Sequence, residues 1–144
     1  MKPHYWLLKT EPGTYSIDDL KKDKSTGWDG IRNYQARNNL RQAKRGDLAL
    51  IYHSVKEKSV VGLAKVIQEA HPDPTSKAKD AKGNPQWVQI EIRFQKKFSS
   101  PLTLETIKKT KELSKLPLIK HTRLSVMPVS EKEFKVILSK VESS

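Results

Sequence analysis

The sequence of 144 residues contains no cysteine, which excludes disulfide bonds, thiolate nucleophiles, iron–sulfur clusters and cysteine-ligated zinc. No apolar run approaches the roughly 20 residues of a membrane-spanning helix, so we expect no membrane span. The N-terminus lacks a charged-then-apolar leader, so nothing marks the chain for secretion. With 35% hydrophobic residues the chain can build one modest core. We therefore expect a single domain, residues 1–144, in the cytoplasm, or in the nucleus if the host is eukaryotic.

Catalytic signatures are also scarce. The chain has no P-loop, GxGxxG, GxSxG or HExxH motif. Its histidines, at positions 4, 53, 71 and 121, show no metal-ligand spacing, so we expect no metal and no cofactor. His53 follows an apolar strand, where it is expected to cap a neighbouring element or to face a pocket. An enzyme is therefore not the leading interpretation.

What the chain has in excess is positive charge. It carries 28 Lys and Arg against 16 Asp and Glu, a net charge of +12. Residues 1–50, 51–100 and 101–144 each carry a surplus of four, so the charge covers the fold and does not form a tail. Such a surface favours polyanionic partners, of which nucleic acid is the commonest. The alternative is a lysine-rich surface that serves only solubility.

Hydrophobic patterning predicts a mixed α+β fold of about five strands, as a sheet or small barrel with short flanking helices. The region at 23–30 is expected to be a turn-rich link, and the one at 71–85 a surface loop. Ser130 and Glu133 form a capping box before an amphipathic helix in which Phe134 begins the apolar stripe. Strands are expected at 4–10, 48–53, 60–70, 87–94 and 124–127, and helices at 16–22, at 33–44, from 103 and from 130 to the C-terminus.

The most informative stretch is 27–40, GWDGIRNYQARNNL. Amides there can read the hydrogen-bonding edge of a base, and aromatic rings can stack on an unpaired base. Arg37, Arg41 and Arg45 could form one basic stripe along the predicted helix. Two plainer alternatives are open: Trp28 could be a core aromatic, and the arginines could be a solvated helix face.

Two further clusters lie at the ends of predicted strands, where polar groups often project into a site. The first contains Lys9, Thr10 and Glu11, and the second contains Tyr52 and Ser54. Lys9 and Glu11 could equally be ordinary surface charges.

These clusters together resemble the signature of EVE-domain proteins. The resemblance runs in order through residues 5–12, 28–40, 46–47, 52–54, 61–62, 72–74, 87–88 and 123–129, and thus covers almost the whole chain. It implies a PUA-like mixed barrel, related to domains that hold RNA bases in a surface pocket. It also implies that the protein reads a modified base, such as a modified cytosine in DNA or a modified base in RNA.

Carried onto this chain, the resemblance implies a base pocket with aromatic walls and polar groups inside it. The predicted pocket residues are Trp6, Lys9, Thr10, Trp28, Asn33, Tyr34, Gln35, Asn38, Tyr52, Ser54 and Ser125, and Arg37, Arg41 and Arg45 are predicted to bind phosphate. The leading hypothesis is a non-catalytic reader of nucleic acid. The alternatives are an amidohydrolase acting on modified nucleosides through Lys9, Glu11 and a Thr or Tyr, and a protein-interaction module.

Overall fold

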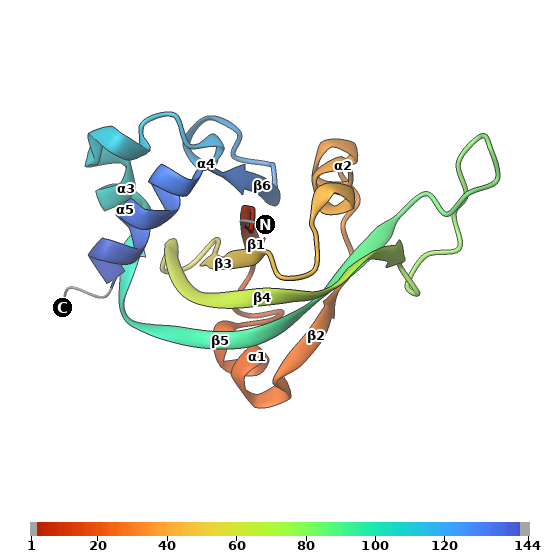
Figure 1. Ribbon diagram of the computed structural model, residues 1–144, viewed down its shortest axis with the longest axis horizontal. Coiled ribbons are helices and arrows are strands. Elements are labelled where there is room, and N and C mark those ends of the chain that lie inside the picture. The colour runs from red at the N-terminus through yellow and green to blue at the C-terminus, as the bar shows by residue number, and fades with distance from the viewer. Residues whose placement is uncertain (1–2, 142–144) are drawn as a thin grey trace.

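The fold is a single sheet with short helices around it, seen in a computed structural model that describes residues 3–141 (Figure 1). The helices and the 3-10 turn η1 lie on both faces and at one end of the sheet. The strands are β1 (Tyr5–Thr10), β2 (Ser25–Trp28), β3 (Leu48–His53), β4 (Ser59–Pro72), β5 (Val88–Thr103) and β6 (Val126–Val129), and the helices are α1 (Ile17–Asp23), α2 (Tyr34–Gln42), α3 (Leu104–Lys109), η1 (Lys111–Leu113), α4 (Pro117–Lys120) and α5 (Glu131–Val141).

The six strands lie in the order β2-β5-β4-β3-β1-β6. Only β1 and β3 run parallel, and the other neighbours are antiparallel. The long strands β4 and β5 shift register at several points, and such irregularities bend strands. Figure 1 shows both strands curving across the molecule. The α+β prediction is confirmed. The end strands β2 and β6 do not pair with each other, so the sheet is not closed into a barrel.

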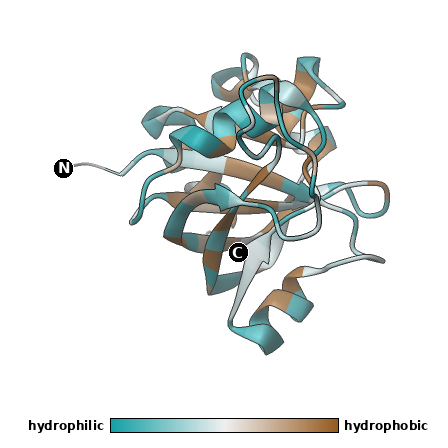
Figure 2. Cartoon of the chain, turned by 90° about the vertical axis from the view of Figure 1, so that its right-hand side faces the viewer, coloured by the Kyte–Doolittle hydropathy of each residue, from teal (hydrophilic) through white to brown (hydrophobic). Residues whose placement is uncertain are grey.

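The core lies between the sheet and its covering helices, and Figure 2 shows the apolar positions gathered on the strands. The Ile17 side chain of α1 packs against β4 at Gly62, which has no side chain. A Cβ at Gly62 would lie 2.8 Å from the Lys96 carbonyl oxygen and would overlap Ile17. Glycine is therefore the residue that lets α1 approach the sheet closely.

The local signals in the sequence place most elements correctly. Ser16 and Asp19 form a capping box at the start of α1, and Asn33 caps α2 by accepting from the Ala36 amide at 2.9 Å. The capping box of Ser130 and Glu133 before α5 is also confirmed.

The sequence prediction fails where pairing is non-local. The stretch expected to be a link contains β2, because residues 25–28 pair with β5. β5 itself continues to Thr103, nine residues beyond the predicted end at Phe94. The residues around Pro117 form the short helix α4, which was not among the expected helices. Pro128 lies inside β6, which tolerates it because β6 is an edge strand.

Candidate nucleic-acid interface

A pocket of about 520 Å³ opens where the end of β1 meets β2. That volume is in the range typical of sites for small ligands. Because β1 pairs in parallel with β3, the chain crosses over from β1 to β3 through α1 and β2, and all but one of the lining residues come from the first 31 residues. Its lining comprises Lys9, Thr10, Thr14, Tyr15, Thr26, Gly27, Trp28, Asp29, Gly30, Ile31 and Ser125.

The polar groups on the β1 side are partly committed. The Lys9 ammonium donates to the Thr122 carbonyl at 2.9 Å, and burial lowers the pKa of Lys9. Two of its three donor positions remain for a ligand. The Thr10 hydroxyl donates to the Tyr15 carbonyl at 2.7 Å, so its oxygen can still accept. This side of the pocket therefore offers one cationic donor and one hydroxyl acceptor.

Two aromatic rings form the apolar part of the pocket. Tyr15 meets Trp28 edge to face, with ring centroids 6.2 Å apart. The Tyr15 hydroxyl donates to the Asp23 carboxylate at 2.8 Å. Burial and then this hydrogen bond raise the pKa of Tyr15 to about 12, so the phenol stays protonated. Trp28 is only 7% exposed and belongs to the core, and it also lines the pocket.

His53 fixes the helix that follows Tyr15. Its Nε2 atom accepts a hydrogen bond from the Ile17 amide at 3.1 Å, which satisfies a free N–H in the first turn of α1. The expectation that His53 caps a neighbouring element is thus confirmed. Burial lowers the pKa of His53, which keeps the ring neutral and able to accept.

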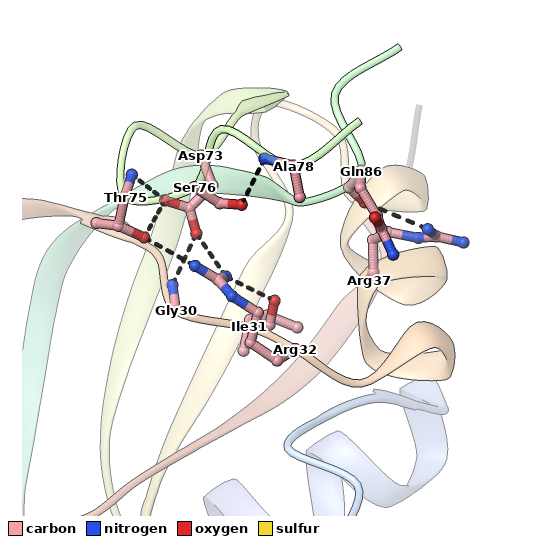
Figure 3. Close-up of polar contacts among 9 residues, drawn as sticks. All are labelled: Gly30, Ile31, Arg32, Arg37, Asp73, Thr75, Ser76, Ala78 and Gln86. Carbon is pink, nitrogen blue, oxygen red and sulfur yellow. Dashed lines mark hydrogen bonds and ion pairs between the residues drawn. The ribbon is translucent and has the colours of Figure 1, made fainter. Parts of the chain in front are cut away.

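The segment after β2 is held by a buried carboxylate, Asp73 (Figure 3). Its oxygens accept from the Gly30 amide at 2.9 Å, the Arg32 guanidinium at 3.1 Å, and the amide and hydroxyl of Thr75. Gly30 has φ 76°, a conformation that suits glycine. Asp73 therefore ties the loop after β4 to the pocket rim.

The ionisation of Asp73 reflects these contacts. Burial alone would raise the pKa of its carboxyl, but hydrogen bonds from Thr75 and Gly30 and the Arg32 guanidinium bring the pKa down to about 2. The carboxylate is thus charged throughout the physiological range.

Of the eleven predicted pocket residues, the structure brings four together at this pocket: Lys9, Thr10, Trp28 and Ser125. Trp6 lies outside it, 4% exposed, with its indole donating to Asp47 at 2.9 Å. Tyr52 is also buried in the core, and Ser54 follows β3, where its amide donates to the Thr10 carbonyl. The remaining predicted pocket residues lie at or on α2 and outside the pocket lining: Asn33, Tyr34, Gln35 and Asn38.

A variant separates the structural role of Trp6 from a binding role. Trp6→Phe is expected to lower the free energy of unfolding by about 1–2 kcal/mol, because Asp47 loses one of its three donors in a buried site. Affinity for nucleic acid should stay within about twofold, measured by titration alongside urea unfolding. A large loss of affinity without loss of stability would return Trp6 to the binding site.

The three predicted phosphate-binding arginines differ in their contacts. Arg37 is half-buried, and it donates to the Gln86 carbonyl at 3.2 Å and to the Asn38 side chain. Arg41 and Arg45 are exposed. Both face solvent as a polyanion-binding side chain must, and the solvated-face alternative fits them equally.

Sequence reasoning missed several lining residues, chiefly Thr14, Tyr15 and Asp29. Asp29 lies within the stretch 27–40, between Trp28 and Gly30. A carboxylate next to an aromatic residue was the sequence signal that could have identified it as a pocket residue. Tyr15 had no such signal, because only the pairing of β2 with β5 brings Trp28 next to it. Glu11, named for the hydrolase alternative, does not line the pocket, so Lys9 lacks that partner there.

Metal-binding groups and membrane-spanning helices are both absent from the described residues 3–141. These residues contain no group of three or more His, Asp or Glu side chains placed to hold a metal ion. None of their helices is long and apolar enough to cross a membrane.

The open mixed sheet with short helices, and a surface pocket at the end of β1, define a PUA-like domain. The chain belongs to the EVE domain family, whose model matches residues 4–140. The resemblance seen in the sequence motifs is thereby confirmed.

Relatives match over nearly the full chain. Thymocyte nuclear protein 1 of Mus musculus is 36% identical, with 97% of this chain and 74% of that protein covered. A hypothetical protein from Leishmania major has a TM-score of 0.90 at 43% identity, covering 99% of this chain and 96% of its own. The human THYN1 protein, crystallised in complex with 5-methylcytosine-containing DNA, has a TM-score of 0.89 at 34% identity, covering 98% and 99%.

Proposed function

We propose that this protein is a DNA-binding domain that reads a modified cytosine, held out of the base stack in the pocket between β1 and β2. The observation that carries the proposal is the likeness to the human protein crystallised with 5-methylcytosine-containing DNA. The net charge of +12 supports a polyanionic partner. Its compartment would follow the host: the cytoplasm, or the nucleus in a eukaryote, as the name of the mouse relative suggests.

The pocket lining suits a cytosine base in particular. Cytosine offers an exocyclic amino donor, and a carboxylate such as Asp29 is its natural acceptor. Lys9 can donate to the base carbonyl, and Trp28 and Ile31 give apolar surface for a 5-methyl group. A paired base uses the same edge within the duplex, so the base must be unpaired or flipped out to meet these groups.

Each contact has an expected size. A charged hydrogen bond to the amino group contributes about 1.5–3 kcal/mol, whereas one buried methyl contributes about 1 kcal/mol. The pocket should therefore select the cytosine amino group more strongly than it senses the methyl.

Single-stranded oligonucleotides that differ at one base test this assignment. We expect 5-methylcytosine to bind about fourfold more tightly than cytosine and at least tenfold more tightly than thymine, which has the same methyl but a carbonyl in place of the amino group. Asp29→Ala should abolish the preference over thymine and leave the preference over cytosine. Asp29 is exposed, so the variant should fold normally.

A matched control accounts for the change in net charge. Glu105→Ala, on α3 and outside the pocket lining, removes one negative charge as Asp29→Ala does. It should leave both preferences unchanged. Equal binding of the three oligonucleotides by the wild type would contradict the proposal, and tighter binding to the matching RNA would redirect it from DNA to RNA.

A further inference from the structure

A second group of flat side chains lies outside the base pocket, where α2 meets the loop after β4. Tyr34 and Trp87 stack with centroids 5.1 Å apart and an interplanar angle of 27°. The Tyr34 hydroxyl accepts from the Gln86 side-chain amide at 2.8 Å. These contacts fix the tyrosine ring, yet the residue is 58% exposed and is one of two large hydrophobic residues so exposed among those described.

The outer face of the Tyr34 ring is open. The Arg37 guanidinium lies 4.9 Å from the Tyr34 centroid and 5.8 Å from the Trp87 centroid. If Arg37 covered the outer face, it would lie roughly twice as far from Trp87 as from Tyr34, because the two rings are stacked. Its similar distance from both rings shows that it does not cover the outer face of Tyr34. One ring face is thus packed on Trp87, and the other is free to stack on a ligand.

Further cations lie on the two segments that form this stack. Arg32 lies 5.6 Å from the Trp87 centroid. The loop carries Lys77, Lys79 and Lys82, all exposed, and none of them makes an ion pair among residues 3–141. Figure 1 shows the loop projecting from the body beside α2.

The loop is ordered by its own contacts. Asp80 accepts from the Lys82 and Asn84 amides, and the Gln86 amide donates to the Ala78 carbonyl at 3.0 Å. It therefore presents its lysines from a defined hairpin-like turn.

We propose that the outer face of Tyr34 stacks a second nucleobase of the same strand, while Arg37 and the loop lysines contact its phosphates. An exposed, fixed ring with cations around it is the arrangement that binds unpaired bases in single-stranded nucleic acid. The inference rests on the proposed function, because it places this base beside the one in the pocket.

The chain limits how far apart the two bases can be. Gly30 lines the pocket and Tyr34 follows four residues later, so their Cα atoms lie within about 14 Å. The Tyr34 side chain and the base in the pocket add to this separation, so at about 3.4 Å per stacked nucleotide we expect the second base within several nucleotides of the modified one.

An abasic scan tests the proposal directly. The ligand is a single-stranded oligonucleotide with one 5-methylcytosine, in which each flanking nucleotide is replaced in turn by an abasic site that keeps its phosphate. With the wild type, one position should lose about 5- to 150-fold in affinity. Tyr34→Ala should show the same loss on the intact oligonucleotide and no further loss at that position, as expected when the ring and that base act as a pair.

Two variants serve as controls. Tyr34→Phe keeps the ring and loses only the hydroxyl contact with Gln86, so it should bind within about twofold of the wild type. Val55→Ala changes the other exposed hydrophobic residue, which lies in a groove beside α3 at the opposite end of the sheet from the loop (Figure 1). It should have no effect.

The outcomes separate the two proposals. Wild-type affinity in Tyr34→Ala, or no abasic position coupled to Tyr34, would contradict stacking on Tyr34, called here the stacking platform. Neither result would affect the proposal for the base pocket. Equal binding of modified and unmodified oligonucleotides, with the coupling to Tyr34 retained, would overturn the proposed function and leave the platform as a site for unpaired bases.

Discussion

Asp73→Ala is expected to lower the free energy of unfolding by about 3 kcal/mol, among the largest effects of any single substitution in the pocket region. The variant leaves the amides of Gly30 and Thr75 without their acceptor and removes the ion pair with Arg32. Urea unfolding monitored by circular dichroism measures the change.

The same variant should weaken binding of a modified oligonucleotide. Gly30 and Ile31 line the pocket, and the Asp73 carboxylate is what holds Gly30 in its left-handed conformation against the loop. We expect about a tenfold loss of affinity at temperatures where the variant is fully folded.

Asp80→Ala is the matched control, because Asp80 accepts two amide hydrogen bonds in the same loop but does not reach the pocket rim. It should cost about 1 kcal/mol or less and leave the pocket preferences intact. Equal effects of the two variants would show that Asp73 stabilises only the loop.

The pH dependence of the free energy of unfolding gives an independent measure of the contribution of Asp73. Its pKa in the folded protein is about 2, below the ordinary value of 3.8. The stability that it contributes is therefore fully present above pH 4 and is lost as the pH falls toward 2. In Asp73→Ala this part of the acid titration should disappear.

Salt should weaken binding steeply if the basic surface contacts phosphates. Arg37, Arg41 and Arg45 with the three loop lysines give six candidate cations. Six contacts to single-stranded DNA predict a slope of about −4 in a plot of log affinity against log salt, or roughly 300-fold between 50 and 200 mM. Fluorescence anisotropy at four salt concentrations measures the slope.

A triple substitution assigns part of that slope. Replacing Lys77, Lys79 and Lys82 with alanine should reduce its magnitude by about 2, because each lost phosphate contact removes about 0.7. The preference for 5-methylcytosine should not change, since none of the three lines the pocket. A slope near zero in the wild type would contradict a phosphate-binding role for this surface.

The parts of the fold that could be predicted are those that depend on neighbouring residues. The capping residues Ser16, Asn33 and Ser130 act within three positions, so the helix starts were found correctly. β2 was missed because its four residues, STGW, become a strand only by pairing with β5 more than sixty residues later.

The candidate site shows the same division. Lys9 and Thr10 could be chosen because they stand at the end of a predicted strand, and Trp28 because it belongs to the aromatic and amide-rich stretch 27–40. Composition does not distinguish Trp6 from Trp28, since the Asp47 carboxylate that accepts from the Trp6 indole lies 41 residues away in the sequence. Tyr34 belongs to α2, and its stacking on Trp87 depends on the path of the loop between β4 and β5.

The most direct test of the central claim is a crystal structure of the protein with an oligonucleotide that carries one 5-methylcytosine. The account predicts the modified base out of the stack and between β1 and β2, with its amino group at hydrogen-bonding distance from Asp29 and its methyl against Trp28 or Ile31. A complex in which the modified base stays stacked on its neighbours, with the pocket holding only water, would contradict it.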